Sequence, residues 1–427
     1  MKTTDLLKAL AEGKADEMLT ALYGSEALDE QKARYSAAIT EFEKLFGADR
    51  DAALYSVAGR TEISGNHTDH NYGRVVAGSL NLDVIAVAAK RDDSMINVNS
   101  QGFGTFSVDF EKYNKPDPDK FTTSDSIIAG MCQGFLKNGH NIGGFDAFTT
   151  SNVLKGSGMS SSAAFEDMIG NILNHMYNDG KVDNIEIAML SQYAENEFFG
   201  KPCGLMDQVA CAAGGLVGID FKDPSAPVIE KMEFDLDGAG YSLCIVNTGG
   251  NHADLGEDYA SVPSEMKSVA AAMGKTVLRE TDEAEVIAAI PALRQSVGDR
   301  AIMRALHFFE ENKRVDSLKE AVKAGDMDGF FRNIMESGRS SFCYLQNVYT
   351  VKNVNEQGIS LALCLADKYL KDKKAAWRVH GGGFGGTIQA FVPTDCAAGF
   401  RDYMDAALGE GSCLILRIRP YGAVKVI

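Results

Sequence analysis

The chain has 427 residues, of which 45% are hydrophobic and 24% are charged, as in an ordinary globular protein. Its formal net charge of −17 argues against binding to nucleic acid or to anionic membranes, because their phosphate groups would repel it. No apolar run approaches the ~20 residues that a membrane-spanning helix needs. Charged residues also interrupt the N-terminal segment where a signal peptide would have its hydrophobic core. We therefore expect a cytoplasmic protein, and the length predicts two domains.

The first half of the chain predicts helices followed by strands and then helices again. Apolar residues recur at helical spacing through residues 1–47. Short β-branched and aromatic segments at 53–58 and 83–89 predict strands. Helical periodicity returns after residue 163 and again over 185–199. These changes of period indicate a mixed α and β class.

The second half mixes both element types. Asp220–Pro224 interrupts the pattern and is the candidate domain boundary. Beyond it we predict strands at 241–246 and 387–392 and helices near 264–273, 298–313 and 355–370.

The cysteines give no sign of a metal site or of a disulfide framework. Eight are scattered along the chain without a Cys-x-x-Cys pair. Free thiols in a reducing compartment are the expected state.

Three glycine- and serine-rich segments lie far apart in the sequence. They are Gly59–Asn71, Gly156–Ala164 and Gly381–Gly386, and Cys203–Gln208 lies between the last two. A single glycine loop has little specificity, whereas an ordered set is far less expected by chance.

The second segment is suited to binding phosphate. It lacks the lysine of G-x-x-x-x-G-K-[ST], but it precedes a predicted helix, whose N-terminal N–H groups and dipole favour negative charge. Its serines offer hydroxyls to phosphate oxygens or to magnesium. The alternative is an ordinary serine N-cap, which uses the same chemistry.

The other two glycine-containing segments leave further alternatives. Gly381–Gly386 matches G-x-G-x-x-G, but too few residues follow it for the rest of a dinucleotide-binding sheet. His67, Asp69 and His70 could bind a metal, although no regular element nearby supplies a third ligand. A polar turn that faces a hydroxyl-rich ligand explains the same residues.

Asp207 is a lone carboxylate in an otherwise uncharged stretch, 202–218. Isolated charges are seldom buried without a partner, and Arg60 of the first segment is the partner that we predict. Such a pair would keep the carboxylate ionised beside a substrate hydroxyl, as a general base requires.

Together these segments resemble the GHMP kinase superfamily and, within it, the galactokinase family. Gly59–Asn71 is similar to the signature G-R-x-N-L-I-G-E-H-T-D-Y-N, and Gly156–Ala164 to G-G-G-L-S-S-S-A. Cys203–Gln208 resembles C-G-I-M-D-Q, and the segment from Arg378 resembles R-x-T-G-G-G-F-G-G. The resemblance extends from about residue 34 to the end of the chain.

The resemblance implies an α+β, two-domain GHMP kinase fold. Its active site would lie in the cleft between an N-terminal mixed α/β domain and a C-terminal ferredoxin-like α+β domain. We expect a helical extension at 1–33, an N-terminal kinase domain at 34–220 and a C-terminal domain at 221–427, whose last strand could return to the N-terminal domain.

The implied reaction is ATP-dependent phosphorylation of a sugar at its anomeric hydroxyl, with ATP and Mg²⁺. Asp207 would be the base and Arg60 would orient it. The residues expected to bind the sugar are Asn66, His67, Asp69, Gly204, Tyr259, Gly382 and Gly383. Those expected to bind ATP phosphates are Gly156, Ser157, Gly158, Ser160, Ser161 and Ser162, and Ser161 and Glu195 would hold magnesium.

Four departures from the family pattern concern the substrate more than the reaction. Asn66 stands where the family has a glutamate that contacts the far end of the sugar, and His380 replaces a threonine. Leu154 and Lys155 replace Pro-Leu, and an arginine pair usually found after Tyr259 is missing.

The sequence therefore leaves the identity of the sugar substrate open. Galactose is the leading expectation, and galacturonate or N-acetylgalactosamine is the alternative, because losing the glutamate removes repulsion toward an acidic sugar. A non-catalytic sensor of sugar or ATP is a further alternative, although it would be expected to have lost Asp207 or the serine loop. The acidic surface is compatible with a monomer or a weak homodimer.

Overall fold

The computed structural model describes residues 1–153, 158–201, 203–249 and 255–427. Its N-terminal segment forms three helices, α1 (Thr3–Ala11), α2 (Asp16–Tyr23) and α3 (Leu28–Phe46), which confirms the helical prediction. Their apolar side chains, Leu6, Leu19 and Phe42 among them, are fully buried against one face of the larger sheet. The expected boundary at residue 33 falls inside α3, so we place the end of this helical unit after residue 46.

The larger sheet has eight strands. Its main path runs β12-β1-β2-β5-β3-β4, and β6 pairs with β2 while β7 pairs with β6. The strands are β1 (Ala52–Ser64), β2 (Arg74–Lys90), β3 (Met95–Ser100), β4 (Gly104–Asp109), β5 (Phe145–Ser151), β6 (Leu216–Asp220), β7 (Val228–Met232) and β12 (Ala423–Lys425). The predicted strands at 53–58 and 83–89 are confirmed as parts of β1 and β2. We call the part of the molecule built around this sheet the larger lobe. Because β7 joins the sheet, the larger lobe continues past the expected boundary at residue 220.

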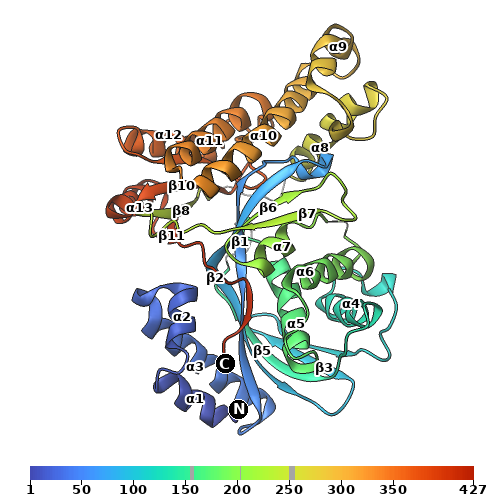
Figure 1. Cartoon of the computed structure of the whole chain (residues 1–427), viewed down its shortest axis with the longest axis vertical. Helices are drawn as coiled ribbons and strands as arrows, with labels where there is room; N and C mark the ends of the chain where they lie inside the picture. Colours follow the sequence, from blue (N-terminus) through green and yellow to red (C-terminus); the bar gives the residue numbers. More distant parts are fainter. Residues whose placement is uncertain (154–157, 202, 250–254) are drawn as a thin grey trace.

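Helices cover the other face of this sheet, opposite α1–α3 (Figure 1). They are α4 (Ser124–Lys137), α5 (Ser161–Tyr177), α6 (Asn184–Tyr193) and α7 (Met206–Ala213). A π-helical turn, Ala194–Phe199, continues α6. The sheet is apolar on both faces because both are covered, and the main core lies between it and α4–α7.

The smaller lobe contains a four-stranded antiparallel sheet of order β11-β8-β10-β9. Its strands are β8 (Tyr241–Asn247), β9 (Ala376–His380), β10 (Thr387–Pro393) and β11 (Cys413–Leu416). The helices are α8 (Gly256–Ala272), α9 (Glu283–Ser296), α10 (Asp299–Ala324), α11 (Met327–Ser340), α12 (Gly358–Leu370) and α13 (Thr394–Leu408). The strands and helices predicted in this half are confirmed.

The C-terminal segment leaves the smaller lobe and returns to the larger sheet, where β12 pairs with β1 (Figure 1). Arg419, on the way, is buried against Asp83, which also accepts a 2.7 Å hydrogen bond from Arg34. Burial opposes ionisation of Asp83, but the two guanidinium groups outweigh it and lower the pKa of this carboxyl. This cluster joins the helical extension, the larger sheet and the C-terminal segment.

No helix in the described part of the chain is long and apolar enough to cross a membrane. All eight cysteines lie in that part, and none forms a disulfide.

Candidate active site

Asp207 and Arg60 form an ion pair where the start of α7 meets β1. Arg60 Nε and Nη2 lie 2.8 and 2.7 Å from Asp207 Oδ1. The Arg60 side chain is 10% exposed and that of Asp207 is 36% exposed, so the carboxylate is the more open partner. Burial opposes the charge of Arg60, but Asp207 outweighs this effect and raises the pKa of the guanidinium. The structure thus brings the predicted base and its predicted partner together.

Ser160 contacts the carboxylate of Asp207. Its hydroxyl donates to Asp207 Oδ2, on the oxygen that Arg60 leaves open. Ser160 has a left-handed conformation with φ of 55° just before α5, and its side chain does not cap the helix. A hydroxyl has one hydrogen to donate. The N-cap alternative fails for this residue, since its side chain does not cap α5, and the expectation that Ser160 belongs to the loop around the ATP phosphates stays a prediction.

This contact predicts a specific defect for Ser160→Ala. Without the hydroxyl, Asp207 loses one of the two groups that orient it, so we expect kcat to fall by about tenfold, in line with the loss of one charge-assisted hydrogen bond. The KM for ATP should change little. Ser162→Ala is the comparison, because Ser162 lines a pocket beside the N-terminus of α5 and should change mainly the KM for ATP. Steady-state kinetics would separate the two; a Ser160→Ala variant with altered ATP KM alone would favour the phosphate role.

Asn66 is committed to a buried hydrogen-bond network. Its Nδ2 donates to Glu62 Oε1 at 3.0 Å and to the Gly381 carbonyl at 2.7 Å. Its Oδ1 accepts from Asn347 at 2.8 Å and from Ser341 at 3.2 Å. The amide thus uses both hydrogens and both lone pairs, and the residue is fully buried. In this network the Asn66 amide has no unused donor or acceptor, and the expectation that Asn66 binds the sugar stays a prediction.

Glu62 lies next to Asn66 in the same network. Its Oε1 also accepts from Arg378 Nη2 at 3.1 Å, and the Arg378 side chain is fully buried. Burial raises the pKa of the Glu62 carboxyl, while Arg378 and Arg60 oppose that rise. Glu62 therefore places a second carboxylate two residues beyond Arg60 on β1.

His67 and Asp69 lie on the turn after β1. His67 Nε2 is 2.8 Å from the carbonyl of Gly382, and burial lowers the pKa of His67 to about 4. The ring is therefore neutral at pH 7 and donates from Nε2. Asp69 is partly exposed, and a Cβ added to Gly204 would lie 3.4 Å from its Oδ2. The turn thus meets both the Gly381–Gly386 loop and the segment that carries Asp207.

The Gly381–Gly386 loop packs tightly against its neighbours. Tyr259 Oη donates to the Gly383 carbonyl at 3.0 Å. A Cβ on Gly382 would lie 2.6 Å from Tyr259 Cε1, and one on Gly383 would lie 2.0 Å from the Asn347 carbonyl oxygen. Gly383 also has a φ of 79°. These close contacts explain the glycines and place Tyr259 beside the loop.

His380 forms part of the contact between β1 and the smaller sheet. Its Nε2 is 3.0 Å from Thr61 Oγ1 and its Nδ1 is 2.8 Å from Thr387 Oγ1. Burial, with Arg60 and Arg378 nearby, lowers the pKa of His380 to about 3. The histidine that departs from the family pattern is therefore a neutral residue of the lobe interface.

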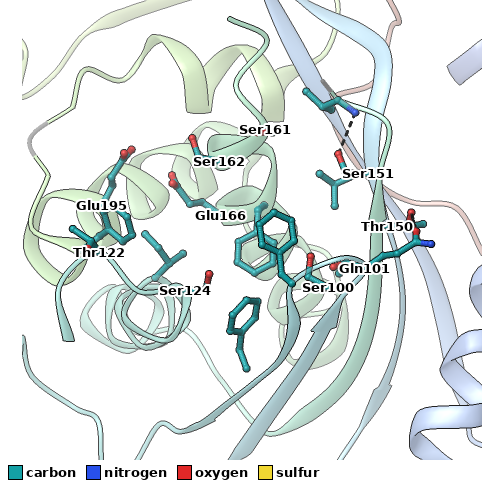
Figure 2. Close-up of a pocket in the computed structure, with 18 of the residues that line it drawn as sticks. Ser100, Gln101, Thr122, Ser124, Thr150, Ser151, Ser161, Ser162, Glu166 and Glu195 are labelled. Atoms are coloured by element: carbon teal, nitrogen blue, oxygen red, sulfur yellow. Dashed lines mark hydrogen bonds between the residues drawn. The ribbon is translucent and has the colours of Figure 1, made fainter. Parts of the chain in front are cut away.

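A pocket of about 780 Å³ opens beside the N-terminus of α5. Its apolar lining includes Val84, Phe103, Phe106, Ile127, Val153, Phe165 and Phe199, and its polar lining includes Ser161, Ser162, Glu166 and Glu195. Figure 2 shows Ser162, Glu166 and Glu195 toward one side of the pocket and Gln101 and Thr150 toward the other. The pocket therefore combines an aromatic, apolar region with the positive end of a helix dipole.

Two buried carboxylates lie side by side at this end of the pocket. Gln208 Nε2 donates to Glu195 Oε2 at 3.0 Å and to Glu166 Oε2 at 3.2 Å. Glu195 also pairs with Lys201 at 3.2 Å. Burial, and then the charge of Glu195, raise the pKa of Glu166 to about 8. A cation bound here would relieve this repulsion.

The expected phosphate loop is described only in part. Gly156 and Ser157, and the departures at Leu154 and Lys155, lie outside the described residues. Gly158 is described, and its carbonyl accepts from Arg60 Nη1. Within the described ranges there is no group of three or more His, Cys, Asp or Glu side chains able to hold a metal, which leaves His67 to His70 without a third ligand.

Comparison with known proteins places this arrangement in a family. Residues 40–90 match the galactokinase galactose-binding signature, and residues 126–215 match the GHMP kinases N terminal domain. A galactokinase of Glaesserella parasuis is 32% identical over 83% of this chain and 89% of its own length. The chain belongs to the galactokinase family. A Streptomyces coelicolor galactokinase is 29% identical over 82% of this chain and 87% of its own.

Solved structures show the same fold. Lactococcus lactis galactokinase complexed with galactose superposes with a TM-score of 0.74, at 24% identity, over 92% of this chain and 99% of that one. A mevalonate kinase superposes with a TM-score of 0.60, at 13% identity, over 86% and 98%. The expected GHMP kinase fold is therefore confirmed.

The sequence analysis did not identify two residues of this galactokinase-family site, Glu62 and Glu166. Glu62 occupies the position where the signature has asparagine, so Glu62 and Asn66 exchange the two residue types of the signature. That exchange was visible in the motif. Glu166 lies five residues after Ser161 and was hidden by the apolar helical pattern around it.

Proposed function

We propose that this protein transfers the γ-phosphoryl group of ATP to the anomeric hydroxyl of galactose or a galactose-like sugar. The observation that carries the proposal is the position of the Asp207–Arg60 pair. It lies between the turn that holds His67 and Asp69 and the N-terminus of α5. A base between a polar sugar site and a phosphate site is the arrangement that the reaction requires.

In the reaction, Asp207 accepts the proton of the sugar hydroxyl while that oxygen bonds to the γ-phosphorus. The bond from the γ-phosphorus to the β–γ bridging oxygen breaks, and ADP leaves. Arg60 holds the carboxylate in place through Oδ1. His67 and Asp69 would bind sugar hydroxyls, as a neutral donor and an acceptor. Positioning and charge stabilisation of this kind supply most of the catalysis in phosphoryl transfer.

The pocket beside α5 would hold the nucleotide. Its phenylalanine rings suit an adenine base, and Ser161 and Ser162 lie where helix N–H groups attract phosphate. Gly156, Ser157 and Gly158 would complete the phosphate loop. Tyr259, Gly382 and Gly383 would close the sugar site from the side of the smaller lobe.

Magnesium fits the acidic end of this pocket. Glu195 and a serine hydroxyl, from Ser161 or Ser162, would hold the ion together with ATP phosphates, since Mg²⁺ usually takes one or two carboxylates and keeps several waters. Glu166 would add negative charge beside it. The ion would neutralise charge on the phosphate oxygens.

Glu195→Gln tests this metal site. Removing the charge should raise the Mg²⁺ concentration for half-maximal activity by about tenfold, because one charge-assisted contact is worth roughly that factor. It should also weaken Mn²⁺ binding to the enzyme–nucleotide complex, measured by electron paramagnetic resonance. Glu197→Gln is the matched control, since Glu197 is exposed in the same π-helical turn. Equal Mn²⁺ affinity in both variants would remove Glu195 from the metal site.

The function itself is tested by ADP release from the purified protein with Mg²⁺ and ATP. The sugars are galactose, galacturonate, N-acetylgalactosamine, glucose and arabinose. Sugar-dependent turnover with galactose, and a sugar 1-phosphate product by ³¹P NMR, is the expected result. Turnover with galacturonate or N-acetylgalactosamine alone would favour those alternatives, and ATP binding without turnover on any sugar would favour a sensor.

We also infer a cytoplasmic protein that acts as a monomer or a weak homodimer. The free thiols support a reducing compartment, and the net charge of −17 supports mutual repulsion between copies.

A further inference from the structure

This chain exchanges the residue types of the galactokinase signature at positions 62 and 66. The galactokinase signature has asparagine and glutamate four residues apart, and this chain has Glu62 and Asn66 at those positions. The two side chains remain in contact through the 3.0 Å hydrogen bond from Asn66 to Glu62. One carboxylate and one amide are thus kept, but their positions are exchanged.

The exchange leaves Glu62 with a free acceptor. Its Oε1 is occupied by Asn66 and Arg378. Its Oε2 accepts no hydrogen bond from any of the described residues, and it is not among the atoms that are both sealed from solvent and unpartnered. The side chain keeps 6% exposure. Since Asn66 uses its whole amide internally, the open position in this network belongs to Glu62.

The position of Glu62 on β1 also suits contact with a sugar that is bound near Arg60 and Asp207. Residues 60 and 62 are two positions apart on β1, and because successive side chains alternate between faces, these two share one face of the strand. Glu62 lies two residues from Arg60 on β1 and accepts a hydrogen bond from Asn66, which directly precedes His67 on the turn that also holds Asp69. Arg378 and Asn66 fix its orientation from behind.

We propose that Glu62 Oε2 accepts a hydrogen bond from a sugar hydroxyl other than the one that is phosphorylated, and that Asn66 acts only as a positioning residue. This inference rests on the proposed function. It narrows the substrate to an uncharged sugar, because a uronate carboxylate would meet both Glu62 and Asp69. The absence of glutamate at position 66 then gives no advantage to galacturonate.

The test compares wild type with Glu62→Gln on galactose and its deoxy analogues. We expect the KM for galactose to rise by about tenfold to a hundredfold, as for loss of a hydrogen bond to a charged group. The change in kcat should be smaller, and the dissociation constant of ATP should not change. Glu230→Gln is the matched control, because Glu230 pairs with Lys319 and Lys323 on β7.

The deoxy analogues identify the contact directly. For wild type, one of 2-, 3-, 4- or 6-deoxygalactose should lose the same factor as the variant loses on galactose. The variant should show no further loss on that analogue, because the two changes remove one interaction. Equal losses for both proteins on every analogue would overturn the proposal, as would equal efficiency of wild type on galacturonate and galactose.

A second variant and the activity of wild type separate a failure of this proposal from a folding defect and from a failure of the proposed function. If Glu62→Gln does not fold because Arg378 loses its partner, Glu62→Asp keeps the charge and serves in the same comparison. Wild type that phosphorylates no sugar would instead refute the proposed function. The two failures are therefore distinct.

Discussion

Asp207→Asn should lower kcat by roughly 10²–10⁴-fold, the usual contribution of a general base. The substitution keeps the size and shape of the side chain but removes the carboxylate that we propose as the acceptor of the sugar proton. ATP affinity should be nearly unchanged, because Asp207 is not among the residues that line the pocket beside the N-terminus of α5. Single-turnover phosphoryl transfer and titration with a fluorescent nucleotide would measure the two effects separately.

Asp316→Asn is a suitable control for this variant. Asp316 is half-exposed and pairs with Arg74 on the surface. It should leave both measurements unchanged. If Asp207→Asn kept activity within tenfold of wild type, the proton acceptor would have to be another group and the proposed mechanism would fail.

Asp83→Ala should cost about 3–5 kcal/mol of folding free energy, as expected when a buried ion-pair network loses its anion. Arg419 is fully buried, and Arg34 is largely so, and both would lose their charged partner. Ser56 and Tyr23 would lose their acceptor as well. Equilibrium unfolding in urea, followed by circular dichroism, would measure the loss.

Asp51→Ala provides the comparison, because its ion pair with Lys2 is exposed and should contribute no more than about 1 kcal/mol. Unfolding measurements at acid pH give a second check on the role of Asp83. The folded pKa of Asp83 lies below the ordinary value of 3.8, so its stabilisation is present above that pH and is lost as pH falls through the folded pKa. The difference between wild type and Asp83→Ala should therefore shrink in acid. Similar losses for both alanine variants would contradict the role given to the buried cluster.

Much of the fold was predictable because local patterns carry it. The helices of residues 1–47 and the strands around 53–58 and 83–89 followed from spacing and residue type alone. The domain boundaries were less accessible. α3 crosses residue 33, although its helical spacing was visible, because the boundary was taken from the start of the family resemblance. β7 joins the larger sheet after residue 220 through strand pairing, which leaves no local mark.

The site shows the same division. The Asp207–Arg60 pair was predictable, because a lone carboxylate and a lone cation must find partners when buried. The contacts of Ser160 and Asn66 were not. Each side chain had two plausible directions, and the choice was made by neighbours distant in sequence, Asp207 for one and Asn347 and Ser341 for the other. A motif fixes residue type but does not fix where a side chain points.

The return of β12 to β1 has a consequence for synthesis of the protein. A ribosome produces the chain from its N-terminus, so β1 is synthesised long before the strand at 423–425 with which it pairs. Asp83 is likewise synthesised long before Arg419. The larger lobe can therefore assemble its helices and inner strands during translation, but one edge of its sheet is completed only after the smaller lobe has been made. The folding of the two lobes is thus coupled in time, and a chain that stalls before residue 419 lacks the strand that pairs with residues 55–57 of β1 and one of the two arginines that pair with Asp83.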